Sequence, residues 1–309
     1  MRNYTYTICI IVAVIIAYNF PQFFTEFKGI KSSVLILPML QLIMFGMGTT
    51  VTGEDFAEVF KSPKSVFIGT ICHFVVMPLL GFGLAHLFNF PTEIAAGILL
   101  IGCCPSGLAS NVMCMIAKAN VALSVTITTI STLLAPFLTP LLMKLLGGGL
   151  IEINFWNMAW DITKIVIIPI GLGYIINYFF KDLSKKLQKI LPYLSMIGIG
   201  VVIIVVTASG QKSLQAVGGM LIVAVLIHNL GGYLLGYAGA KLLKMPEQDC
   251  RTVALEVGMQ NAGMASGLAN QLGKIATLGV ASALFGPIMN ITGSILSSWW
   301  GKRPPAATA

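Results

Sequence analysis

Long stretches of this chain carry almost no charge. Only 10% of its 309 residues are Asp, Glu, Lys or Arg, and 56% are hydrophobic, whereas an ordinary soluble domain is about 25% charged. A helix needs about 20 apolar residues to cross a bilayer. The sequence divides into ten such segments, residues 4–20, 34–51, 65–88, 93–117, 121–146, 155–180, 190–209, 217–243, 249–272 and 276–300. They predict an all-α integral membrane protein and leave too few residues for an appended catalytic domain.

The first segment leaves one alternative open. Arg2 followed by the apolar run Ile8–Ala17 has the pattern of a secretory signal peptide. No small-x-small cleavage site follows, because the next residues are Tyr18-Asn19-Phe20-Pro21. We therefore expect a membrane helix here, which keeps the number of segments even.

The net charge of +8 is distributed unevenly between the loops. If both termini are cytoplasmic, most basic residues face the cytoplasm, namely those at positions 2, 61, 64, 118, 181, 185, 186, 189, 241, 244, 251, 302 and 303. Only Lys28, Lys31, Lys144, Lys212 and Lys274 face outward, and Lys164 is expected to pair with Asp161. This bias is typical of membrane proteins, so the basic charge requires no nucleic-acid partner.

The six cysteines form no C-x-x-C pair, and Cys103-Cys104 lacks the spacing of metal ligands. We expect all six, which are Cys9, Cys72, Cys103, Cys104, Cys114 and Cys250, to be small buried hydrophobic residues.

The two halves of the chain match each other at an offset of 155 residues. At this offset His73 meets His228, Leu79-Leu80-Gly81 meets Leu234-Leu235-Gly236, and Pro91 meets Pro246. The repeats would be residues 1–150 and 151–309, each with five segments. An odd number of segments makes the second copy enter the membrane from the opposite side. Inverted repeats of this kind are the architecture of secondary transporters, whose sites lie at broken helices near the middle of the membrane.

The same offset places Cys104-Pro105-Ser106-Gly107 of the fourth segment on Met259-Gln260-Asn261-Ala262 of the ninth. Proline removes a backbone donor, and glycine tolerates non-helical backbone, so we expect both helices to be interrupted. Gly and Pro are also common in membrane helices as simple kinks, which is the alternative for either position alone. Two polar interruptions at one repeat position favour a binding site.

Glu256 is one of only 11 acidic residues and lies in a segment with almost no other charge. A charged group at mid-membrane costs at least ~2.5–3.5 kcal/mol, so it usually serves an ion, a proton or a substrate. Glu256 and Gln260 share a helical face if the turn between them is regular. Ser110-Asn111 and the pair Ser124 and Thr128 supply further oxygens. Carboxylate, amide and hydroxyl oxygens suit a hard cation rather than zinc or copper.

Five motifs in these segments resemble the bile acid:sodium symporter family, which includes bacterial carriers of small organic anions. They are E-V-G-M-Q-N-A-G at Glu256–Gly263, A-S-N-V-M at Ala109–Met113, N-V-A-L-S-V-T at Asn120–Thr126, I-M-F-G-M-G at Ile43–Gly48 and I-H-N-L-G-G-Y at Ile227–Tyr233. The resemblance implies ten helices. The third to fifth and eighth to tenth would form a core domain with two crossing broken helices. The first, second, sixth and seventh would form a panel domain.

The resemblance also implies two sodium sites and an organic-anion site. The first sodium site would use Ser110, Asn111, Ser124, Thr128 and Glu256. The second would use Glu256, Gln260 and the carbonyls of Val257 and Met259, with His73 where well-known members carry Gln. Imidazole is a poorer sodium ligand than an amide oxygen. The anion would meet Ser106, Gly107, Leu108, Ala109, Asn261, Ala262, Gly263 and Asn290. Some bacterial relatives have a His-Asn pair at the last position, but this chain has Met289-Asn290.

The resemblance implies a sodium-coupled symporter of an organic monocarboxylate in a bacterial inner membrane. The substrate would be a small hydroxy or keto acid such as pantoate or ketopantoate, or a bile acid. Its partners would be membrane lipid, two Na⁺ as coupling ions and the anion, with no cofactor and no obligate protein partner. The alternative is a proton-coupled carrier or efflux protein of the same type. An intramembrane enzyme is disfavoured because the 3 histidines form no H-E-x-x-H motif and no G-x-S-x-G is present.

Overall fold

The computed structural model describes residues 2–53 and 61–303, and nearly all of them are helical. In this part of the chain the strands are two residues long, and β1 (Glu26–Phe27) pairs antiparallel with β2 (Ile30–Lys31). The helices before residue 53 are α1 (Arg2–Asn19), α2 (Gln22–Thr25), η1 (Ser32–Leu35) and α3 (Ile36–Gly48). The chain is therefore an all-α protein, as predicted from its sequence.

The remaining elements run from α5 to α15 along the chain. They are α5 (Pro63–Leu87), α6 (Thr92–Cys103), α7 (Ala109–Ile116), α8 (Val121–Gly147), α9 (Phe155–Ile162), η2 (Thr163–Ile167), α10 (Ile168–Phe179), α11 (Lys181–Ser209), α12 (Gln211–Leu242), α13 (Glu247–Gly258), α14 (Ala262–Gln271) and α15 (Gly279–Gly301).

Six helices in the described residues are long and apolar enough to cross a membrane. They are α5, α8, the continuous run α9–η2–α10 (Phe155–Phe179), α11, α12 and α15. Shorter apolar helices cover Cys9–Asn19, Ser32–Gly48 and Thr92–Cys103. Length and composition thus confirm a multi-span membrane protein. Two predicted segments, 93–117 and 249–272, are pairs of short helices with a break between them, at the positions where interruptions were expected.

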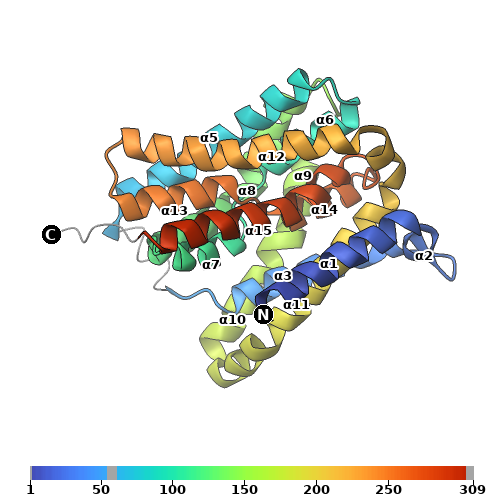
Figure 1. The fold of residues 1–309 in the computed structure, drawn as a ribbon. Coiled ribbons are helices and arrows are strands. Elements are labelled where there is room, and N and C mark those ends of the chain that lie inside the picture. Colours follow the sequence, from blue (N-terminus) through green and yellow to red (C-terminus); the bar gives the residue numbers. More distant parts are fainter. Residues whose placement is uncertain (1, 54–60, 304–309) are drawn as a thin grey trace.

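The helices gather into two groups (Figure 1). In the first group α12 packs against α5, α13 and α15, and α6 packs against α5, α8 and α15. In the second group α11 and α10 pack against α3, and α1 lies along α11. The short half-helices α7, α13 and α14 belong to the first group, and α14 also contacts α3.

Glycines allow the second group to pack closely. A Cβ atom on Gly48 of α3 would lie 2.1 Å from the backbone oxygen of Ile170, and one on Gly173 of α10 would lie 2.3 Å from that of Phe45. Larger side chains at either position would force α3 and α10 apart. Small residues at close crossings are typical of membrane helices, where packing replaces the hydrophobic effect as the main attraction between helices.

Two smaller predictions have different outcomes. Lys164 pairs with Asp161 as expected, with 2.7 Å between its Nζ and a carboxylate oxygen. The expectation that every cysteine is buried is wrong, because Cys9 is exposed and Cys72 is half-buried. In a membrane helix the outer face is itself apolar, so a small hydrophobic residue has no reason to avoid it. All six cysteines are free.

Candidate functional site

The first break separates α6 from α7. Cys104, the residue after α6, has extended backbone with φ −73° and ψ 158°. Pro105 follows, and a helix usually ends at or before the residue that precedes a proline. The Cys104 N–H still bonds the Leu100 carbonyl, but the N–H groups of Ser106 and Gly107 donate outside their own helix, to Ser131 Oγ and the Met259 carbonyl. Helix α7 then begins at Ala109.

The second break separates α13 from α14. Helix α13 ends at Gly258, and Met259 has extended backbone with φ −105° and ψ 108°. The Asn261 side chain accepts a hydrogen bond of 3.0 Å from the Met264 N–H and so caps α14. The turn after Glu256 is therefore not regular, so the condition under which Glu256 and Gln260 would share a helical face is not met. Gln260 lies in the break, beyond the end of the helix.

The two breaks cross and pair with each other, and we call residues 104–108 and 259–261 the crossing. Ser106 and Gln260 form an antiparallel bridge. The Gly107 N–H donates to the Met259 carbonyl at 3.0 Å, and the Asn261 N–H donates to the Pro105 carbonyl at 2.9 Å. Each break thus satisfies backbone groups of the other, as irregular backbone inside a membrane requires.

Glycine permits this close approach. A Cβ on Gly107 would lie 2.6 Å from the backbone oxygen of Gln260. Any side chain at position 107 would push the two breaks apart.

Glu256 is completely buried next to the crossing, in the last turn of α13. Three hydroxyl groups donate to its carboxylate. Ser110 Oγ and Ser124 Oγ each lie 2.5 Å from Oε1, and Thr128 Oγ1 lies 2.8 Å from Oε2. Ser110 comes from α7, whereas Ser124 and Thr128 lie one turn apart on α8. The structure thus brings together Ser110, Ser124, Thr128 and Glu256, four residues of the predicted first sodium site.

The groups around the Glu256 carboxylate form a cluster with more acceptor oxygens than hydroxyl protons. A hydroxyl has one proton, yet each of the three faces a second acceptor. Ser124 Oγ lies 2.8 Å and Thr128 Oγ1 lies 3.2 Å from Asn111 Oδ1, and Ser110 Oγ lies 2.8 Å from the Gly107 carbonyl. An oxygen-rich, proton-poor cluster of this kind favours a positively charged ion. The donor set is one of hard oxygens, and the described residues contain no group of three or more His, Cys, Asp or Glu that could hold a metal.

Gln260 offers a further free oxygen. Its Nε2 donates to the Val257 carbonyl at 2.7 Å, but its buried Oε1 has no hydrogen-bond partner. A buried acceptor without a partner costs about 1–3 kcal/mol. The Met259 carbonyl, in contrast, already accepts from Gly107 and, at 3.3 Å, from Ser106 Oγ.

His73 of α5 joins the two helix ends that flank the crossing. Its Nδ1 lies 3.0 Å from the Glu256 carbonyl, and its Nε2 lies 2.9 Å from the Cys104 carbonyl. Both ring nitrogens are thus directed at backbone oxygens. His228, the residue that the repeat pairs with His73, bonds the Met77 carbonyl at 2.9 Å and packs edge-on against Phe285.

A cavity of about 150 Å³ lies between the crossing and the second group of helices. The predicted anion-binding residues that line it are Gly107, Leu108, Ala109, Asn261, Ala262, Gly263 and Asn290. Ser106 does not line it. It is buried, and its hydroxyl points to the Met259 carbonyl.

Sequence reasoning missed several residues around this cavity. Ser266 and Ser282 line it, and their hydroxyls lie 2.8 Å apart. Leu40 and Met44 of α3 and Val202 of α11 close its other side. Ser266 lies three residues after the motif that ends at Gly263, which was a usable signal. The residues of α3 and α11 are apolar and gave no such signal.

Comparisons with known proteins show which family the chain is similar to. The family model for the sodium bile acid symporter family matches residues 37–217. The sodium-dependent transporter YocS of Bacillus subtilis (strain 168) is 41% identical over 97% of this chain and 91% of its own length. Two chloroplastic proteins named as probable sodium/metabolite cotransporters are also similar. BASS1 of Arabidopsis thaliana is 32% identical over 86% of this chain, and BASS2 of Oryza sativa subsp. japonica is 34% identical over 85%. The matches cover 66% and 63% of these plant proteins.

Proposed function

The chain belongs to the sodium bile acid symporter family, and from this premise we propose that it couples the entry of sodium to the entry of an organic monocarboxylate. Its relatives are named as transporters and cotransporters, so it is a sodium-dependent transporter and not an enzyme. The observation that carries the proposal is the oxygen cluster around buried Glu256 at the crossing of two broken helices.

The proposed architecture is ten spans in two inverted repeats, residues 1–150 and 151–309. Helix bounds support it. The first residues of α6 and α13, Thr92 and Glu247, are 155 positions apart, and so are their last residues, Cys103 and Gly258. The ends of α5 and α12 at Leu87 and Leu242 have the same separation. In this proposal the first helix group is the core domain and the second is the panel domain.

The first sodium ion would bind among Ser110, Asn111, Ser124, Thr128 and Glu256. The shortage of protons in this cluster supports the assignment, because a cation supplies the positive charge that the oxygens lack. Sodium would also neutralise Glu256, which lowers the cost of a charge at this depth.

The second sodium ion would bind between Glu256 and the break after α13, using Gln260 and the carbonyls of Val257 and Met259. The unpartnered Oε1 of Gln260 supports this site. The two contacts of His73 to carbonyl oxygens favour a bracing role for its ring over direct coordination.

The anion would bind in the cavity against the crossing. Its carboxylate would meet the N-terminal ends of α7 and α14, where the positive ends of the helix dipoles favour negative charge. Its remaining polar groups would meet Asn290 and the Ser266 hydroxyl. Drug-sized ligands occupy pockets of about 300–1,000 Å³, so a cavity of about 150 Å³ supports a small hydroxy or keto acid such as pantoate or ketopantoate over a bile acid.

Alternating access would follow from movement of the core against the panel. Two sodium ions with one monocarboxylate would carry one net positive charge inward. The membrane potential then adds about 2.3 kcal/mol per 100 mV to the driving force. We place the protein in a bacterial inner membrane with both termini cytoplasmic, as the distribution of Lys and Arg predicts.

A thermal-shift screen of the purified protein against small organic acids, with sodium or choline as the cation, tests the proposal. A ligand that binds only the folded state at 100 times its Kd stabilises that state by about 2.7 kcal/mol. We expect sodium alone to raise the unfolding temperature, and one acid to raise it further only when sodium is present. Glu256→Gln should remove both effects, whereas Glu26→Gln in the exposed β1 should keep them. Equal stabilisation by acids in sodium and in choline would contradict the proposal.

A further inference from the structure

A second and larger cavity, of about 840 Å³, lies between α12 and α15. It shares no lining residue with the cavity at the crossing. One part of it is apolar and the other is basic and aromatic. The apolar part consists of Leu230, Leu234, Ile295 and Leu296. Leu234 and Ile295 are 68% and 66% exposed, so in a bilayer this part opens to the acyl chains.

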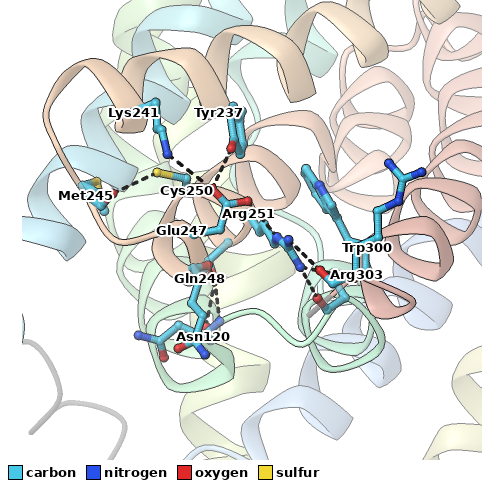
Figure 2. Close-up of polar contacts among 12 residues, drawn as sticks. Asn120, Tyr237, Lys241, Met245, Glu247, Gln248, Cys250, Arg251, Trp300 and Arg303 are labelled. Atoms are coloured by element: carbon cyan, nitrogen blue, oxygen red, sulfur yellow. Dashed lines mark hydrogen bonds and ion pairs between the residues drawn. The ribbon is translucent and has the colours of Figure 1, made fainter. Parts of the chain in front are cut away.

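Arg251 organises the other part, together with Tyr237, Lys241, Glu247 and Trp300, which we call the Arg251 cluster (Figure 2). Arg251 is 5% exposed and donates to Glu247 Oε1 at 3.0 Å. It also donates to two carbonyls at the end of α15 and just beyond it, at 3.2 Å to Trp300 and 2.9 Å to Arg303. A third carbonyl, that of Ala117 after α7, accepts from Arg251 at 3.3 Å. One guanidinium thus ties together α13, α7 and α15.

Within the cluster the charge of Arg251 is balanced. Glu247 accepts from Arg251 and, at 2.7 Å, from Tyr237. Burial alone would raise the pKa of the Glu247 carboxyl, but these hydrogen bonds and the charges of Arg251 and Lys241 hold it below its usual value. Glu247 is therefore ionised at neutral pH, and its pair with Arg251 is neutral overall.

Arg303 is the basic side chain of the cavity lining whose charge is not balanced by a carboxylate among the described residues. Its backbone belongs to the Arg251 contacts, but its guanidinium extends away from the cluster (Figure 2) and lies 4.6 Å from the centre of the Trp299 ring. Among the described residues no carboxylate pairs with it. Lys241, in contrast, does not line the cavity, and its Nζ lies 3.5 Å from Glu247 Oε2.

We propose that an anionic phospholipid occupies this cavity, with its phosphate at Arg303 and an acyl chain along Leu234 and Ile295. The order of the lining matches such a molecule. Tryptophan and tyrosine mark the level of the membrane interface, and basic pockets between helices bind acidic headgroups. Ile295 lies six residues before the end of α15 at Gly301, which corresponds to about 9 Å along the helix and reaches from the headgroup to the acyl chains.

The inference depends on the membrane setting and not on sodium coupling. It also assigns a consequence to the lipid. Because the phosphate would lie next to the contacts that join α13, α7 and α15, its binding would stabilise the end of the core at which these helices meet. If sodium-driven transport were not found, the proposed lipid site would still stand. If the lipid site were not found, the proposed sodium coupling would still stand.

The test is the unfolding temperature of the delipidated, detergent-purified full chain, titrated with phosphatidylglycerol or with phosphatidylcholine of the same acyl chains. A basic residue near the membrane surface changes lipid affinity by roughly fivefold. We expect the anionic lipid to stabilise the protein at about fivefold lower concentration. Arg303→Gln should bring the two lipids to equal effect without changing the unfolding temperature of the lipid-free protein.

Lys212→Gln is the matched control, because Lys212 is also exposed and lies at the opposite end of α12. It should keep the preference for phosphatidylglycerol. A preference that survives Arg303→Gln would overturn the proposal, as would equal effects of both lipids on the unmodified protein. Two further results would assign the cavity to another occupant. One is full stabilisation by glycerol phosphate without acyl chains, and the other is a dimer that forms through this face in place of lipid binding.

Discussion

At the scale of single residues, the candidate site depends on an excess of acceptor oxygens over hydroxyl protons. Glu256 is surrounded by three hydroxyls that each have two acceptors within 3.2 Å. The identity of these residues could be predicted from sequence, because a carboxylate well inside a membrane segment is conspicuous. The direction of His73 could not be predicted, since the spacing of residues along one helix does not specify which carbonyls of two other helices its ring meets.

His73→Gln is the most informative substitution at this scale. An amide oxygen coordinates sodium better than an imidazole whose nitrogens are directed at the Glu256 and Cys104 carbonyls. We expect the sodium concentration for half-maximal thermal stabilisation to fall by up to about tenfold, which corresponds to about 1.4 kcal/mol. His86→Gln is the control, because His86 is exposed and distant from the breaks. An unchanged sodium midpoint in His73→Gln would show that position 73 takes no part in sodium binding.

At the scale of elements, the two breaks are the decisive features. Their positions were predictable from Pro105 and from Gly258 and Gly263, because these residues weaken helical backbone. Their mutual pairing was not, because an antiparallel bridge between Ser106 and Gln260 depends on how α6 and α13 cross in space. The regular turn on which a shared helical face of Glu256 and Gln260 depended is absent, because α13 ends between them. Hydrogen bonds across the crossing replace the ones that a continuous helix would make.

Gly107→Ala tests the crossing as an element. The added methyl group would lie 2.6 Å from the Gln260 carbonyl oxygen, and such overpacking costs about 1–3 kcal/mol. We expect a lower unfolding temperature together with a loss of sodium-dependent stabilisation, since both sodium sites adjoin the crossing. Gly83→Ala in α5 is the matched control, because nothing lies within 4 Å of its added Cβ. Equal behaviour of the two variants would mean that the crossing tolerates separation.

At the scale of the whole molecule, hydropathy alone predicted an all-α membrane protein, and the six long apolar helices confirm it. The inverted repeat stays a prediction, now supported by helix ends that recur 155 residues apart. The large cavity between α12 and α15 was beyond sequence reasoning. Its basic and apolar residues come from α12, α13 and the region of α15, and they form one surface only when these helices pack together.

The proposed orientation predicts which loops a membrane-impermeant thiol reagent can reach. In a background without the native cysteines, Lys31→Cys in β2 should react in intact cells, whereas Lys186→Cys in α11 should react only after permeabilisation. Both native side chains are exposed, so burial does not complicate the comparison. Labelling of Lys186→Cys in intact cells would reverse the orientation and undermine the inward direction of transport.

Uptake into proteoliposomes tests sodium coupling most directly. The labelled acid that stabilises the purified protein best would be supplied outside, with an inward sodium gradient or with choline in its place, at one pH and one membrane potential. We predict uptake against the concentration gradient of the acid in sodium, and its loss both in choline and in Glu256→Gln. Uptake that survives in choline and follows an imposed proton gradient would contradict the account and make Glu256 a proton carrier.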